Sequence, residues 1–223
     1  MSVKDNLLKI KNTIPSNVKL VAVSKTKPLE LIQEAYDAGY RIFGENRPQE
    51  LKQKYEELPK DIEWHFIGHL QSKQVKYYAS FVSLIHGVDS LKLLQAVNKE
   101  AVKNDRIIDC LLEFHIAQEE SKFGLNIEDA FQILKSKEFA ELKNIRVCGV
   151  MGMATFTDNK EQIRKEFKKL KNIFTELKKE FFADSDSFKE ISMGMSGDYL
   201  IAIEEGSTMV RIGSSIFGSR NYI

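Results

Sequence analysis

Cysteine is scarce in this sequence, with two in 223 residues. Cys110 and Cys148 lie within apolar segments and lack the spacing of metal ligands, so they indicate neither a disulfide framework nor a zinc site. Histidine is also scarce, with four in the chain. His65 and His69 are four residues apart, but they do not form the helical His-Glu-x-x-His pattern. We therefore expect no bound metal.

Long apolar runs are missing as well. No stretch reaches the roughly 18 residues of a membrane-spanning helix, and the first residues lack the apolar core of a signal peptide. Neither sign of charge dominates, because 33 Lys and Arg balance 32 Asp and Glu for a net charge of +1. This balance gives no electrostatic case for nucleic acid or an anionic membrane as a partner. We expect a cytoplasmic protein that binds neither.

What the sequence does have is a regular alternation of strand and helix patterns. Short apolar runs predict strands at 20–24, 41–44, 64–68, 81–86, 107–114, 145–150, 190–193 and 209–212. Helical patterns follow them at 29–38, 48–57, 70–78, 90–103, 126–136, 159–180 and 198–204, and an extra helix precedes them at 3–12. Eight such units fit one α/β domain over residues 1–223, a TIM-type (β/α)₈ barrel. An open doubly wound sheet is the alternative, although no Gly-x-Gly-x-x-Gly follows the first strand.

Lys25 lies where the first predicted strand opens into a loop. Pro28 then ends the strand and suits the first turn of a helix. In (β/α)₈ barrels this end of the strands carries the functional sites. The side chain is either a solvated charge or an amine that forms a Schiff base. The second role needs a pKa below the ordinary value of about 10.4, and the nearby positive charge of Lys27 favours such a shift.

Two loops rich in glycine and serine follow the last two predicted strands, at Ser192–Asp198 and Val210–Gly218. Glycine lets backbone N–H groups approach a ligand, and serine hydroxyls complete an anion site. The alternative is that these are ordinary turns. Because both loops lie at one end of adjacent strands, where barrels hold phosphate, we favour a phosphate cradle. An amine opposite a phosphate cradle, with an arginine between them, suits a ligand with an aldehyde and a phosphate, and pyridoxal 5′-phosphate (PLP) is such a ligand.

Six motifs spread over almost the whole chain carry a family resemblance. They are Ala22–Lys27, Phe43–Asn46, Trp64–Gln71, Ser121–Gly124, Gly194–Asp198 and Gly206–Gly218. In these segments the sequence resembles the pyridoxal phosphate homeostasis protein family, which shares its barrel with the N-terminal domain of alanine racemases.

The resemblance implies a role for each site residue. Lys25 would form the internal aldimine with PLP, and Arg211 would face the pyridine nitrogen. The phosphate would be held by Ser196, Gly213 and Ser214. Asn46 would line the cofactor pocket, and the resemblance also places His65 and Met151 near it.

The same resemblance bears on whether the chain is an enzyme. A permanently charged arginine at the pyridine nitrogen keeps that nitrogen unprotonated and weakens the cofactor as an electron sink. Alanine racemases also have a second domain, which supplies a catalytic tyrosine across a dimer interface, and this sequence has no such segment after Gly218. We therefore expect a monomeric PLP carrier that takes part in vitamin B6 homeostasis without turnover. A weak PLP-dependent racemase is the alternative, and an aldolase that uses Lys25 on a phosphosugar is a third reading.

A carrier of this family is expected to pass PLP to apo-enzymes through transient contacts. Lys122 is either a second lysine that receives the cofactor or an ordinary surface lysine.

Overall fold

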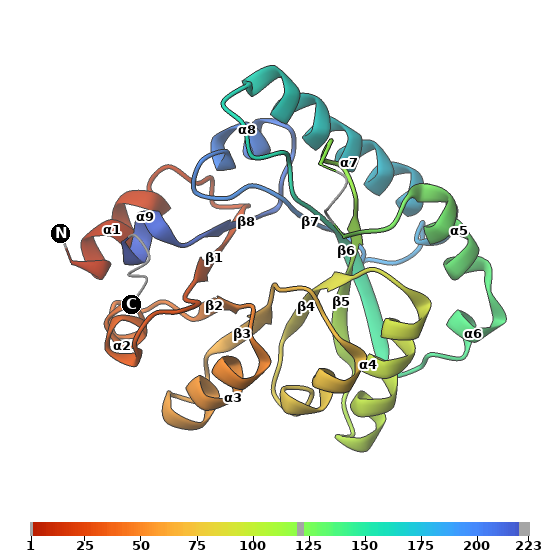
Figure 1. Ribbon diagram of the computed structural model, residues 1–223, viewed down its shortest axis with the longest axis horizontal. Helices are drawn as coiled ribbons and strands as arrows, with labels where there is room; N and C mark the ends of the chain where they lie inside the picture. The colour runs from red at the N-terminus through yellow and green to blue at the C-terminus, as the bar shows by residue number, and fades with distance from the viewer. Residues whose placement is uncertain (1, 120–122, 219–223) are drawn as a thin grey trace.

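Eight parallel strands close into a barrel in the computed structural model, which describes residues 2–119 and 123–218 (Figure 1). The strands are β1 (Lys19–Val23), β2 (Ile42–Glu45), β3 (Glu63–Phe66), β4 (Leu84–Val88), β5 (Ile108–Phe114), β6 (Ile145–Gly152), β7 (Glu190–Ser192) and β8 (Met209–Ile212). Each strand pairs with the next one in the chain, and β8 closes the sheet on β1 with Ala22 opposite Ile212. The predicted (β/α)₈ barrel is confirmed, and the open doubly wound sheet is wrong because the sheet has no edge.

Helices follow the strands around the outside of the barrel (Figure 1). They are α1 (Val3–Lys11), α2 (Leu29–Asp37), α3 (Pro48–Glu57), the 3₁₀ helix η1 (Ser72–Tyr77), α4 (Leu91–Lys103), α5 (Ile127–Lys135), α6 (Lys137–Ala140), α7 (Lys160–Phe181), α8 (Tyr199–Glu204) and α9 (Ser214–Phe217). The extra N-terminal helix is confirmed as α1. Its first turn is capped by Ser2, whose Oγ accepts the Asp5 N–H at 3.1 Å, and Asn6 ties it to α9 by donating to the Ile216 carbonyl at 3.0 Å.

The sequence prediction misses the form of one connection. The segment predicted as a helix at 70–78 is a 3₁₀ helix at Ser72–Tyr77, and the strand expected at 81–86 is β4 at Leu84–Val88. Backbone N–H groups explain the delay, because Phe81 and Val82 both donate to the Tyr78 carbonyl and thus close the preceding turn. The apolar residues Phe81 and Val82 therefore belong to the turn that follows η1, and the strand begins after them.

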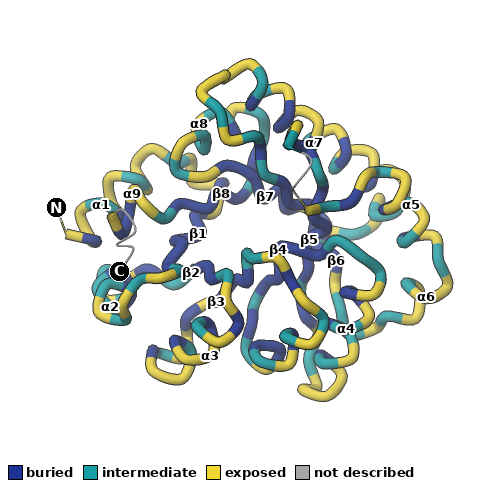
Figure 2. Tube along the Cα trace, viewed as in Figure 1, coloured by how far each residue is buried: buried dark blue, intermediate teal, exposed yellow. Residues whose placement is uncertain are grey.

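Apolar side chains fill two regions, one between the strands and the helices and one inside the barrel. Figure 2 shows the strands buried and the exposed residues on the outer sides of the helices. The inner cluster consists of Val21, Leu84, Leu111, Cys148, Met151 and Met209. Both cysteines are buried free thiols. The interior of the barrel is therefore a packed core and not a channel.

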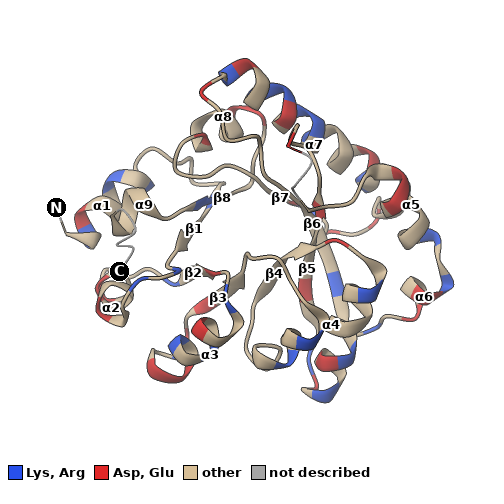
Figure 3. Ribbon diagram, in the orientation of Figure 1, with Lys and Arg blue, Asp and Glu red and all other residues tan. Residues whose placement is uncertain are grey.

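The outer surface carries charges of both signs. Figure 3 shows basic and acidic residues side by side on α3, α4 and α7. Within the described residues, no helix has the length and apolar character needed to cross a membrane, and no group of three or more metal-ligating side chains comes together. The distinctive chemistry of the chain lies instead at the carboxyl ends of the strands.

Candidate functional site

A cavity of about 550 Å³ opens at the carboxyl ends of the strands. Its walls come from the segments that follow β1, β3, β6, β7 and β8. Five of the six predicted site residues line it: Lys25, Ser196, Arg211, Gly213 and Ser214. A cavity of this volume suits a small molecule of cofactor size.

Lys25 enters the cavity from a tight turn at the end of β1. The turn begins at Ser24, whose N–H donates to the Gly44 carbonyl at 3.0 Å, and Lys27 N–H returns to the Ser24 carbonyl at 3.1 Å. Thr26 has φ +60°, in the left-handed region that β-branched residues rarely adopt. Lys25 itself is half-buried.

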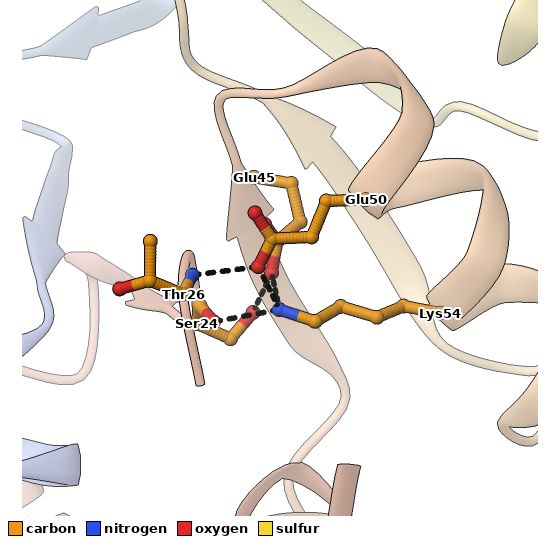
Figure 4. A network of polar contacts seen from close by, with 5 residues as sticks. All are labelled: Ser24, Thr26, Glu45, Glu50 and Lys54. Atoms are coloured by element: carbon orange, nitrogen blue, oxygen red, sulfur yellow. Dashed lines mark hydrogen bonds and ion pairs between the residues drawn. The ribbon is translucent and has the colours of Figure 1, made fainter. Parts of the chain in front are cut away.

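A network of polar side chains, buried at Ser24, Glu45 and Lys54 and partly exposed at Glu50, holds this turn against α3 (Figure 4). Lys54 Nζ donates to Glu45 Oε1 at 2.8 Å, Glu50 Oε1 at 2.7 Å and the Ser24 carbonyl at 2.8 Å. The Ser24 hydroxyl donates to Glu45 Oε1 at 2.5 Å, and the Thr26 N–H donates to Glu50 Oε1 at 2.6 Å. Burial raises the pKa of Glu45 to about 7, although Lys54 and Ser24 both act to lower it.

The loops after β7 and β8 meet on another side of the cavity. Ser196 Oγ accepts the Gly213 N–H at 3.3 Å, and the Met195 N–H donates to Asp198 Oδ1 at 2.5 Å. Gly194 starts the first loop at φ +96°, where an added Cβ would lie 2.6 Å from Ala202 Cβ. At Gly213 an added Cβ would lie 3.0 Å from the Val23 carbonyl. Glycine at these positions lets the first loop pack closely against α8 and the second lie close to β1.

The cradle has hydroxyl and amide groups but little helix dipole. Ser214 opens α9, which has four residues, so the charge separation of a long helix is absent. Ser196 Oγ, the Ser214 hydroxyl and the surrounding N–H groups are the donors that this corner of the cavity offers. They match the oxygens of a phosphate group.

Arg211 projects from β8 into the same cavity and is 4% exposed. Its Nη1 donates to Ser192 Oγ at 2.7 Å and its Nη2 to the Gly152 carbonyl at 3.2 Å. Burial lowers the pKa of Arg211 to about 10, while Asp198 and Glu113 oppose that shift. The guanidinium is therefore a cation at neutral pH, in a fixed orientation.

Behind Arg211 a column of polar side chains crosses the barrel interior. Ser192 Oγ lies 3.0 Å from His86 Nδ1, and His86 Nε2 lies 3.0 Å from His65 Nδ1. Burial lowers the pKa of His65 to about 3 and holds the pKa of His86 well below its ordinary value. Both imidazoles are neutral at pH 7, so the column supports Arg211 without adding charge.

Three residues that the resemblance placed at or near the pocket do not line this cavity. Asn46 follows β2, and its Oδ1 is buried without a hydrogen-bond partner among the described residues. His65 lies in the polar column and borders a second cavity, at the opposite end of the barrel. Met151 packs in the inner apolar cluster. Lys122 lies outside the described residues.

Sequence reasoning missed the side chains that support Lys25 and Arg211. Glu50 and Lys54 are four residues apart on a predicted helix, a spacing that usually marks a solvated ion pair. Here the Lys54 side chain is 5% exposed. Ser192 belonged to a predicted loop motif, but nothing in the sequence pairs it with His86 on a distant strand. Their roles depend on closure of the barrel.

Known proteins give independent comparisons for this geometry. The family described as "Alanine racemase, N-terminal domain" matches residues 1–221. A pyridoxal phosphate homeostasis protein of Aquifex aeolicus is 42% identical over 205 residues, which cover 92% of this chain and 88% of that protein. The human protein with the same name is 38% identical over 214 residues, which cover 92% of this chain and 77% of that protein.

Solved structures agree with the sequence relatives. PipY of Synechococcus elongatus superposes with a TM-score of 0.90 without PLP and 0.88 with PLP bound, at 31% identity, over 97% of this chain and all of that one. An alanine racemase of Clostridium difficile is 16% identical, with a TM-score of 0.79 over 98% of this chain and 60% of that one, and so shares the fold. The chain belongs to the pyridoxal phosphate homeostasis protein family, and its barrel is that of the alanine racemase N-terminal domain.

Proposed function

We propose that this protein binds PLP in the cavity at the carboxyl ends of the strands and carries it as a Schiff base on Lys25. The observation that supports this most directly is the shared cavity, which contains the Lys25 amine, the Ser196–Gly213–Ser214 cradle and the Arg211 guanidinium. PipY, a family member of known structure, has been observed with PLP bound. The role of the protein would be intracellular PLP homeostasis.

Each residue has a distinct part in this proposal. The neutral Lys25 amine adds to the aldehyde carbon of PLP, and one water leaves as the Schiff base forms. The Ser196 hydroxyl and the N–H groups at Gly213 and Ser214 donate hydrogen bonds to the phosphate oxygens. Ile67 and Met153 line the same cavity and supply apolar surface for the ring. Asn46 is the sixth proposed contact; its backbone lies against Gly68, and its buried Oδ1 has no hydrogen-bond partner among the described residues.

We further propose that binding is not followed by turnover. PLP supplies an electron sink for carbanion chemistry, and the depth of that sink depends on protonation of the pyridine nitrogen. Arg211 is buried, charged and fixed by Ser192 and Gly152, so it disfavours a proton on a nitrogen placed against it. Among the described residues that line the cavity there is no tyrosine or histidine to serve as a second base.

The proposed cellular role follows from PLP binding without turnover. We propose a cytoplasmic monomer that exchanges PLP with solution and passes it to apo-enzymes through transient contacts. The weak racemase is the competing function, because the barrel has the fold of alanine racemases.

Visible absorption spectra test the attachment site. The purified protein with added PLP should show a yellow Schiff-base band that borohydride abolishes, and mass spectrometry should place the reduced label on Lys25. Lys25→Ala should show neither the band nor that label, while Lys27→Ala, which changes a second lysine of the cavity, should retain both. A wild-type protein that stays colourless with excess PLP would overturn the proposal.

Amino acids then separate carrier from racemase. Incubation of the PLP-loaded protein with L-alanine should produce no D-alanine above the level given by Lys25→Ala. Enantiomer exchange over many turnovers, present in the wild type and lost in that variant, would show that the protein is an enzyme.

A further inference from the structure

The backbone on both sides of Lys25 is held by side chains of one helix. On the N-terminal side, the Ser24 carbonyl accepts Lys54 Nζ at 2.8 Å. On the C-terminal side, the Thr26 N–H donates to Glu50 Oε1 at 2.6 Å. Figure 4 shows both contacts reaching from α3 to the turn. Lys25 is the one residue between these two fixed positions, Ser24 and Thr26.

Every donor of Lys54 in this network has an acceptor, whereas Glu45 Oε2 is buried without a hydrogen-bond partner among the described residues. The three N–H donors of the Lys54 ammonium have three acceptors, on Ser24, Glu45 and Glu50. Its side chain is 5% exposed and that of Glu45 is fully buried. Desolvation of such charges is costly, and their main benefit is a defined geometry.

Attachment of α3 to the barrel does not explain this arrangement. Leu51 on the same helix is fully buried in the apolar core, so the helix has an ordinary packing contact. What the polar network adds is an acceptor for the Thr26 N–H while Thr26 is at φ +60°. Without that acceptor, a β-branched residue returns readily to φ below zero, and the preceding Lys25 changes direction.

We propose that Glu50 and Lys54 are positioning residues for Lys25. They fix the turn from Ser24 to Thr26 so that the Lys25 amine projects into the cavity in one orientation. Glu50 acts directly on Thr26, and Lys54 fixes Glu50 and Ser24 together. This inference rests on the proposed function of Lys25, but the turn itself can be measured without cofactor.

Substitutions at Glu50 give the sharpest test. Glu50→Ala removes the acceptor of the Thr26 N–H and leaves Lys54 paired with Glu45. Glu50→Gln keeps a carbonyl oxygen at nearly the same place and should rescue the effect. Glu56→Ala is the matched control, because Glu56 lies on the same helix in an exposed i,i+4 ion pair with Lys52 at 3.6 Å. Thermal melts of each variant verify that it is folded.

The first readout uses the protein without PLP. We expect faster hydrogen exchange at the Thr26 amide in Glu50→Ala, and wild-type exchange in Glu50→Gln and Glu56→Ala. Trace acetylation followed by mass spectrometry should show a changed rate at Lys25 in Glu50→Ala only. Equal Thr26 exchange in wild type and Glu50→Ala would overturn the proposal.

The second readout uses PLP. Trapping with borohydride at timed intervals should show Schiff-base formation on Lys25 slowed about tenfold in Glu50→Ala, a factor equivalent to about 1.4 kcal/mol. Glu50→Gln should stay within about twofold of wild type. A Gln variant as slow as the Ala variant would contradict positioning through the Thr26 N–H. If the wild type itself fails to form the adduct, the proposed function is wrong, and the cofactor-free readout still decides the role of Glu50.

Discussion

Lys54→Met should destabilise the protein by an amount that depends strongly on pH. The substitution removes the cation from a buried pair and leaves the Glu45 carboxyl, which is fully buried, without an opposing charge. Breaking one partner of a buried ion pair typically costs about 3–5 kcal/mol. We expect that cost near pH 8, where Glu45 is ionised in the wild type, because burial raises its pKa only to about 7.

The sign of the pH dependence follows from Glu45. In the wild type Lys54 acts to lower the pKa of Glu45, so its removal raises that pKa further. A carboxyl whose folded-state pKa lies above its unfolded value stabilises the fold at low pH, and this contribution is lost as pH rises through the folded pKa. At pH 5 the Glu45 carboxyl in the variant is neutral. The loss of unfolding free energy relative to wild type then falls to the contribution of the lost hydrogen bonds, about 1–3 kcal/mol.

Urea denaturation at pH 5, 6.5 and 8 measures this difference. Lys52→Met, an exposed change on the same helix, should cost less than about 1 kcal/mol at every pH. In a Glu45→Gln background, Lys54→Met should lose most of its pH dependence because the titrating carboxyl is gone. A deficit of equal size at pH 5 and pH 8 would refute the argument that an uncompensated Glu45 charge causes it.

Three further outcomes follow from the cavity and its surroundings. Arg211→Ala should weaken PLP binding by roughly 10- to 150-fold, as loss of a hydrogen bond to a charged group does, and unchanged affinity in an absorbance titration would show that the guanidinium does not contact the ring. Gly213→Ala should reduce labelling of Lys25 by PLP more than labelling by pyridoxal, because the added Cβ would lie 3.0 Å from the Val23 carbonyl in the phosphate cradle; an equal loss with both aldehydes would place the phosphate elsewhere. Glu113→Gln should stabilise the fold above pH 7 by up to about 3 kcal/mol relative to wild type. Burial and Asp89 raise the pKa of Glu113 to about 7, so its ionisation above that pH lowers the stability of the wild type. Denaturation at pH 5, where the gain should vanish, is the check.

Much of the barrel is predictable because its strands are buried on both faces. Continuous apolar runs such as Leu20–Val23 identify β1 directly, and the first residues after such a run must lie at the end of the barrel that carries sites. The position of Lys25 follows from this rule alone. The 3₁₀ helix Ser72–Tyr77 does not, because its apolar residues have the same spacing as those of a short α-helix and only the backbone hydrogen bonds distinguish the two.

The polar supports of the site are harder to predict for a physical reason. Glu50 and Lys54 have the sequence spacing of a surface pair, and the burial of Lys54 results from α3 packing over the end of β1. His86 and Ser192 are 106 positions apart and meet at 3.0 Å because closure of the barrel brings side chains of β4 and β7 into the same interior. Local sequence patterns show whether a segment has the periodicity of a helix or of a strand. They do not show which distant side chains meet inside the folded barrel.

These supports show how the site is made rigid. Lys25 follows β1 and Arg211 lies in the neighbouring strand β8, yet each is fixed by a separate polar network, one from α3 and one through β7 and β4. A network with satisfied donors restricts side-chain orientation more strongly than apolar contacts do, at a cost in desolvation. If both networks serve orientation, Glu50→Ala should change the reactivity of the Lys25 amine and leave Arg211 unaffected. Ser192→Ala should release Arg211, and so change PLP affinity, while Lys25 reactivity stays the same. Chemical labelling of Lys25 in both variants, together with PLP affinity, separates the two effects. A Ser192→Ala protein with altered Lys25 reactivity and unchanged PLP affinity would show that the two networks are not independent.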